Sequence, residues 1–217
     1  MTPKLLKWLY YLVGMVHLLG IVFNNQEVLT ATKPFLMPIL LYYVYRSQIE
    51  QVTLKTILLW ISLVFAWLGD LALMQADAYF LSGVGMFFIA QLCYILLFFK
   101  SVEEPIKFKA LPLLPYLLSG ILLFYILLPK TDELLIPVFI YGISLIGMAG
   151  IARLRQGITA SKSYYYVLIG TLLFLISDTL LALNKFVWDI PYAGIGIMST
   201  YMAAQLLITE GILQDEQ

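Results

Sequence analysis

Apolar runs about as long as a bilayer core recur along the whole 217-residue chain, separated by short polar connections. A transmembrane helix needs roughly 20 mainly apolar residues, and most of the runs reach or approach that length. They lie at roughly 4–23, 34–46, 54–76, 79–100, 109–129, 134–152, 162–184 and 192–213. The pattern predicts one all-α transmembrane domain, residues 1–217, built as a bundle of eight helices.

The second run is the shortest of the eight and contains two prolines. Pro34 suits the first turn of a helix, where its missing N–H costs nothing, whereas Pro38 would kink the helix that contains it. We therefore expect a short second helix that begins near residue 34.

The distribution of positive charge predicts the orientation of the bundle. If the loops alternate sides, ten Lys and Arg residues lie on the side of the N-terminus and three on the other. Because Lys and Arg accumulate in cytoplasmic loops, both termini are predicted to be cytoplasmic. In a bacterial host the protein would lie in the inner membrane. The first run is followed by no small-residue cleavage site, so we expect a membrane span there and not a cleaved signal.

The composition agrees with a membrane protein and excludes several other classes. The chain is 62% hydrophobic and 12% charged, whereas soluble domains are about 25% charged. Its formal net charge is zero and no basic or acidic block occurs, so nothing indicates nucleic-acid binding. The single cysteine, Cys93, allows neither an internal disulfide nor a CxxC pair. No protein partner can be inferred.

Two aspartates interrupt apolar runs and are the main candidates for chemistry. "FAWLGDLALM" (65–74) contains Asp70, and "FLISDTLLAL" (174–183) contains Asp178. A charged side chain at the centre of a bilayer costs roughly 2.5–3.5 kcal/mol, so such residues usually face a bundle interior and usually have a function. Their two helices should run in the same direction, which places each carboxylate about 10 Å below the same end of the bundle. His17 reaches a similar depth.

Two interpretations of these aspartates stay open. They could pair with Lys33, His17 or the backbone and only hold helices together. Alternatively, they share a cavity in which one is protonated and one ionised, a pair that can donate a proton and handle a water molecule. His17 itself could be a packing residue or a proton-transfer group, and polar residues such as Gln91, Tyr201 and Gln205 could be hydrogen-bonded contacts between helices.

Missing motifs narrow the possible chemistry. One histidine cannot build a three-histidine zinc site, and the chain has no HExxH, GxSxG, P-loop or GxGxxG pattern. Because these motifs are missing, we expect acid–base chemistry by carboxylates, with no metal and no organic cofactor.

Several segments together resemble the YhhN/TMEM86 family of integral membrane proteins, whose characterised members are lysoplasmalogenases. In chain order they are "TKPFLMPIL" (32–40), "FAWLGDLALM" (65–74), "FLSGVGMFFIAQLCYILLFF" (80–99), "GTLLFLISDTLLALNKF" (170–186) and "STYMAAQLLI" (199–208). They span nearly the whole chain. Where the family pattern "AHLxY" has a histidine, this sequence reads "AQLCY", with Gln91.

The resemblance implies hydrolysis of the vinyl ether bond of a lysoplasmalogen, giving a fatty aldehyde and a glycerophospho-base. It implies that Asp70 and Asp178 are catalytic, by analogy with the two carboxylates of glycosidases, and that a lysophospholipid enters from the bilayer with its phosphate near Lys33 or Lys185. The residues we predict to bind the substrate are His17, Asn24, Lys33, Gln91, Asn184, Lys185, Tyr201 and Gln205.

Two other functions use the same residues. A proton-coupled carrier of a small amphiphile would also need intramembrane acids, but such carriers typically have helices broken at the midplane. The predicted helices at 54–76 and 162–184 contain no proline, and their acids lie off-centre, which counts against a carrier. A lipid-binding or scaffold protein without turnover is the third possibility.

Overall fold

The computed structural model describes residues 1–47, 52–75, 77–102 and 104–214. The described residues form eight α-helices and four short 3-10 turns, with no strand among them. The helices are α1 (Pro3–Val22), α2 (Gln26–Ser47), α3 (Leu54–Leu73), α4 (Phe80–Lys100), α5 (Leu114–Leu127), α6 (Leu135–Leu154), α7 (Ser161–Phe186) and α8 (Ala193–Leu213). The 3-10 turns η2 (Leu111–Leu113) and η3 (Leu128–Lys130) extend α5 at its two ends.

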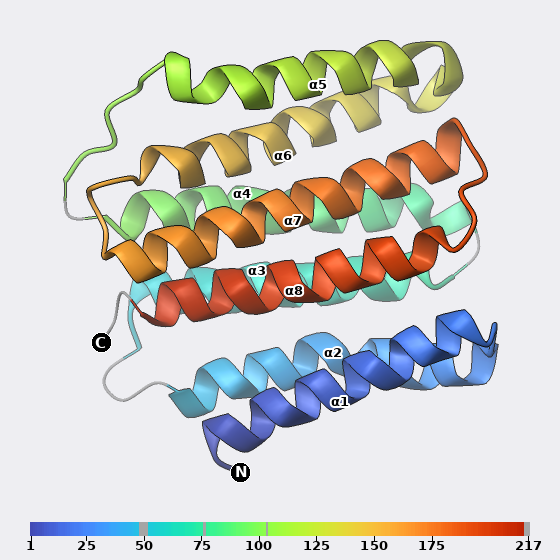
Figure 1. Ribbon diagram of the computed structural model, residues 1–217, viewed down its shortest axis with the longest axis horizontal. Helices are drawn as coiled ribbons and strands as arrows, with labels where there is room; N and C mark the ends of the chain where they lie inside the picture. The colour runs from blue at the N-terminus through green and yellow to red at the C-terminus, as the bar shows by residue number, and fades with distance from the viewer. Residues whose placement is uncertain (48–51, 76, 103, 215–217) are drawn as a thin grey trace.

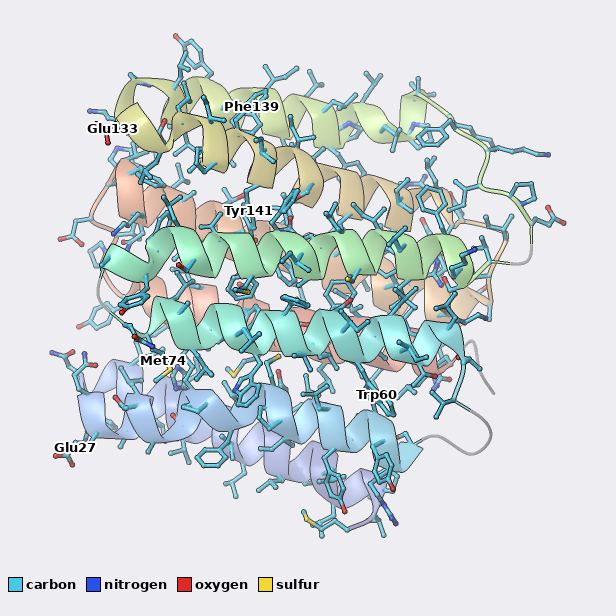
Figure 2. All side chains as sticks on the ribbon, turned by 180° about the vertical axis from the view of Figure 1, so that it is seen from behind. Glu27, Trp60, Met74, Glu133, Phe139 and Tyr141 are labelled. Carbon is cyan, nitrogen blue, oxygen red and sulfur yellow. The ribbon has the colours of Figure 1, made fainter. Side chains whose placement is uncertain are left out.

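All eight helical segments are long and apolar enough to cross a membrane. This confirms the predicted all-α bundle, and the protein is an integral, multi-pass membrane protein. The helices lie side by side as a slab, with α1 and α2 at one edge and α5 at the other (Figure 1). The two chain termini lie at the same end of the bundle (Figure 1), whereas Glu27 and Glu133 lie at the opposite end (Figure 2). Which side of the membrane the termini face stays a prediction from the charge bias.

The predicted start of the second helix is wrong. Helix α2 begins at Gln26, so Pro34 and Pro38 both lie inside it and Pro34 is not in its first turn. The turn before α2 is tight, because Asn24 adopts a left-handed φ of 51° and the side chain of Asn25 accepts a hydrogen bond from the Val28 N–H at 3.2 Å. Asparagine is one of the few residues that adopts this conformation readily.

A contact from the neighbouring helix stabilises α2 at its prolines. Pro38 has no N–H, so the carbonyl of Pro34 cannot receive the usual helical hydrogen bond. The indole N–H of Trp67 on α3 donates to that carbonyl instead, at 2.8 Å. Because a buried carbonyl without a donor is costly, this bond lets a proline-containing helix continue across the bundle.

Helices α7 and α8 pack closely because each presents a glycine to the backbone of the other. A Cβ at Gly170 would lie 3.0 Å from both Ala204 O and Ile208 N, and one at Gly211 would lie 3.0 Å from Val167 N. Small residues allow such close approach between membrane helices. The α7–α8 pair carries Asp178 and Tyr201, so this packing fixes one side of the site described below.

Replacing Gly170 by leucine should force α7 and α8 apart. We expect Gly170→Leu to destabilise the protein by about 1–3 kcal/mol, the usual cost of overpacking, and to lower its thermal unfolding temperature in detergent. Gly85→Leu is the matched control, because a Cβ at Gly85 on α4 would meet nothing within 4 Å. Equal unfolding temperatures for the two variants would contradict this packing.

Candidate active site

Asp70 and Asp178 line the same cavity, which has a volume of about 220 Å³. Its walls come from α2, α3, α4, α7 and α8, and the lining combines Leu, Phe, Ile and Met side chains with a few polar ones. The polar lining residues are Lys33, Asp70, Ser177, Asp178, Lys185 and Tyr201. Five residues that we predicted as site residues therefore come together, from four different helices.

The Asp70 carboxylate has a different partner on each oxygen. Its side chain is buried, Tyr201 of α8 donates to Oδ2 at 2.7 Å, and the Lys33 ammonium of α2 lies 3.6 Å from Oδ1. A buried carboxylate needs this kind of compensation, because removal from water is costly for a charge. These contacts fix Asp70 between α2 and α8.

The glycine before Asp70 shapes the cavity wall. A Cβ at Gly69 would lie 2.7 Å from the ring of Phe87, so glycine is needed for Phe87 of α4 to pack against α3 at this point. The Phe87 ring also packs edge to face on Tyr201, with ring centroids 5.8 Å apart. Phe174 holds the other side of Tyr201 at the same centroid distance. The Tyr201 ring is thereby fixed with its hydroxyl on Asp70.

Asp178 has a different environment. Tyr141 of α6 donates a hydrogen bond to its Oδ2. Tyr141 is partly buried against the hydrophobic core and lies between α6 and α4 in the view of Figure 2. Among the described residues, Asp178 forms no ion pair. Next to it, Ser177 donates to the carbonyl of Ile197 at 3.0 Å and ties α7 to α8. The two carboxylates therefore share a cavity and each accepts a hydrogen bond from a tyrosine, but among the described residues Asp70 faces an ammonium and Asp178 does not form an ion pair.

Our sequence analysis did not select Tyr141. The signal was present, because a single hydroxyl stands in the otherwise apolar stretch "LIPVFIYGI" (135–143). Tyrosine is also common at membrane interfaces, and a sequence does not distinguish that use from a buried one.

Gln91 and Gln205 are fully buried but do not line the cavity. Ser144, one turn from Tyr141 on α6, donates to Oε1 of Gln91, and Tyr94 of α4 donates to Oε1 of Gln205 at 2.5 Å. Both amides therefore join neighbouring helices. These positions favour a role in helix packing over the predicted contact with a substrate.

Three other predicted residues are not among those that line the cavity. His17 Nδ1 lies 2.8 Å from the Thr32 hydroxyl and links α1 to α2. Asn24 forms the left-handed turn after α1, and Asn184 Oδ1 accepts from the Ile190 N–H at 3.0 Å in the loop between α7 and α8. None of the three lines the cavity, so their positions do not support the predicted substrate binding.

Comparisons of the sequence with known proteins point to one family. The model of the YhhN family matches residues 28–212. Lysoplasmalogenase TMEM86B from Homo sapiens is 36% identical over 153 residues, which cover 70% of this chain and 62% of the relative. The Rattus norvegicus protein of the same name is 34% identical over 146 residues, covering 67% and 57%. Lysoplasmalogenase TMEM86A from Homo sapiens is 31% identical over 166 residues, covering 73% and 66%.

The chain thus matches less than two thirds of the length of these relatives. No solved structure matches it.

Proposed function

The chain belongs to the YhhN family, and from this we propose that it is an intramembrane hydrolase of lysoplasmalogens that cleaves their vinyl ether bond. The observation that carries the proposal is the pair of carboxylates in one cavity inside the bundle, each bonded by a tyrosine, with an ammonium beside Asp70. A proton-coupled carrier is not favoured, because the relatives are named for hydrolysis.

The chemistry of a vinyl ether explains why two carboxyl groups are needed. This bond resists bases and nucleophiles, but it cleaves once a proton reaches the alkenyl carbon distal to the oxygen. Protonation produces an oxocarbenium ion, which water captures at the carbon bonded to oxygen. A site for this reaction needs one acid that supplies the proton and one carboxylate that stabilises the cation and accepts a proton from the attacking water, as in glycosidases.

The surroundings of the two aspartates indicate which of them takes each role. Asp70 faces the Lys33 ammonium at 3.6 Å, and an adjacent cation favours an ionised carboxylate. We therefore assign to Asp70 the role of stabilising the oxocarbenium ion and orienting the water. Asp178 has no ion pair among the described residues, and because Tyr141 donates to its Oδ2, its Oδ1 is left to carry the proton. We assign to Asp178 the role of general acid.

In this mechanism the protons and bonds balance within the cavity. Asp178 transfers its proton to the distal alkenyl carbon, and a water molecule adds to the other carbon while Asp70 takes one of its protons. The resulting hemiacetal collapses to the fatty aldehyde, and the glycerol oxygen leaves with a proton. The net reaction consumes one water, and both carboxyl groups return to their starting states after proton exchange with solvent.

The cavity also suits the polar part of a single-chain lipid. Lys33 and Lys185 line it together with the aspartates, so a phosphate could lie near an ammonium while the vinyl ether lies at the carboxylates. Lys185 is a suitable probe of this contact, because replacing Lys33 would also remove the ion pair of Asp70. The ammonium of Lys185 lies 5.2 Å from the centre of the Phe80 ring, which holds it at the cavity wall.

Lys185→Gln should weaken substrate binding more than it slows the chemistry. A charge-assisted contact to phosphate is worth about 1.5–3 kcal/mol, and solvent near Lys185 partly screens it. We therefore expect KM to rise about tenfold, with kcat changed little. Lys130→Gln removes the same charge from the same end of the bundle, outside the cavity, and should leave KM unchanged. A fall in kcat at constant KM for Lys185→Gln would contradict a role in phosphate binding.

The experiment that tests the function uses purified protein in vesicles that contain a lysoplasmalogen or its ester-linked analogue. We expect release of fatty aldehyde from the first lipid and no hydrolysis of the second, because an ester has no alkenyl carbon to protonate. Movement of intact lipid from one leaflet of the vesicles to the other without release of aldehyde would instead indicate a carrier.

A further inference from the structure

A second polar cavity lies at the end of the bundle that carries both chain termini. Its volume is about 340 Å³, and it is formed by the segment between α4 and α5 together with the end of α6. Three basic residues line it, namely Lys107, Lys109 and Arg153, with one acidic residue, Glu104. Figure 1 shows the linker and the end of α6 next to each other at this end. None of the site residues discussed above lines this cavity.

The chain holds the basic residues around this cavity from both sides. The linker is anchored at its start, where the buried Ser101 hydroxyl donates to the Phe98 carbonyl at 3.0 Å, and again at Ile106, which packs against the hydrophobic core. On the α6 side, Arg153 donates to the Tyr164 hydroxyl at 3.0 Å and to the Gln156 side chain at 2.5 Å. The position of the guanidinium is therefore set before any ligand binds.

The charges around the cavity are not balanced. Among the described residues, none of its three cations forms an ion pair, whereas Lys7 and Lys33 elsewhere in the bundle each face a carboxylate within 4 Å. The general excess of Lys and Arg in cytoplasmic loops explains why cations occur at this end. It does not explain why three of them, from two separate segments, surround one cavity.

We propose that this cavity binds the phosphate of an anionic phospholipid from the leaflet at the end of the bundle that carries the termini. Basic pockets between transmembrane helices are suited to such headgroups, and the guanidinium of an arginine matches the geometry of a phosphate. Pro112, Leu154 and Ile158 also line the cavity and supply an apolar surface for the glycerol part of the lipid. The site lies at the opposite end of the bundle from Lys185, which lines the aspartate cavity, and its existence does not depend on the proposed hydrolase activity.

The test is native mass spectrometry of the full-length protein in detergent, titrated with phosphatidylglycerol or with zwitterionic phosphatidylcholine. We expect phosphatidylglycerol to bind at least tenfold more tightly. The double variant Lys107→Gln/Lys109→Gln should bind it about 30-fold more weakly, because each cation near an anionic lipid surface contributes about a fivefold factor. The matched control, Lys4→Gln/Lys100→Gln, removes the same charge from exposed positions at the same end and should bind as the wild type does.

Three outcomes would overturn the proposal. If both double variants lose binding equally, only the net charge of this end of the bundle matters and the cavity has no specific role. If the two lipids bind alike, the cavity does not select an anionic headgroup. A third arm adds inorganic phosphate. If low millimolar phosphate displaces phosphatidylglycerol completely, the site belongs to a soluble phosphate and not to a lipid. Because the readout is binding, these results do not depend on whether the protein hydrolyses lysoplasmalogens.

Discussion

Replacing Asp70 or Asp178 by asparagine is expected to reduce vinyl ether hydrolysis by at least about 100- to 10,000-fold, the usual worth of general acid–base catalysis. Asparagine keeps the size of the side chain but can neither deliver the proton nor accept one from water. Both aspartates line the same cavity, so either change should remove one of the two proton transfers that the reaction needs. The measurement is aldehyde release per mole of folded protein at saturating substrate.

The two variants should differ in their response to pH. In Asp178→Asn the proton must come from solvent, so the residual rate should rise in proportion to hydronium concentration as the pH falls. In Asp70→Asn the acid is intact, and the residual rate should respond less steeply. Asp189→Asn is the control for the substitution itself, because Asp189 is exposed and does not line the cavity.

The opposite pattern of pH dependence would exchange the roles that we assign to the two aspartates. Wild-type rates in both folded variants would remove the aspartates from the chemistry altogether. Asp70→Asn also leaves the Lys33 ammonium without its carboxylate, so each variant must first be shown to unfold near the wild-type temperature.

The second large effect is expected from the two tyrosines that donate to the carboxylates. Tyr201→Phe and Tyr141→Phe keep the aromatic packing but remove a hydrogen bond to a charged or reacting group, worth about 1.5–3 kcal/mol. We expect kcat to fall roughly 10- to 100-fold in each variant, because the aspartate is no longer held toward the reacting bond. Both are positioning residues in this account.

A double-mutant cycle tests whether each tyrosine acts through its aspartate. If Tyr201 only positions Asp70, then Asp70→Asn/Tyr201→Phe should be no slower than Asp70→Asn alone. Tyr43→Phe is a close control, since the Tyr43 hydroxyl also donates to a carboxylate, that of Glu210, away from the cavity. Additive losses in the double variant, or an equal loss for Tyr43→Phe, would contradict the positioning role.

The helices could be predicted because, inside a membrane, the local sequence largely determines the secondary structure. Every backbone polar group in a lipid bilayer must be paired within the protein, so a long apolar run is almost obliged to be a helix. The start of the second helix was mispredicted because its first eight residues, 26–33, include several polar side chains and so do not extend the apolar run. The helix also contains Pro34 and Pro38, and the Trp67 indole bonds the carbonyl of Pro34 that Pro38 leaves without a donor, a contact between residues far apart in the sequence.

The candidate site was predictable only in part, because depth in the membrane does not fix the direction in which a side chain points. His17 was expected at the depth of the aspartates, yet it faces Thr32 of α2 and not the cavity. Lys33, one residue further along α2, does line the cavity. Which side of a helix faces the site depends on packing between helices, such as the contact of Gly69 with Phe87, and a single sequence does not contain that information.

The central claim is that carboxylates inside the bundle protonate a vinyl ether and direct water to its alkenyl carbon. The most direct test is to supply purified wild-type protein with a lysoplasmalogen in ¹⁸O-labelled water and to weigh both products by mass spectrometry. The account predicts equal amounts of fatty aldehyde and glycerophospho-base, with no heavy oxygen in the glycerophospho-base, since its glycerol oxygen never leaves the glycerol carbon. Heavy oxygen in that product, or no products from folded protein, would contradict the account.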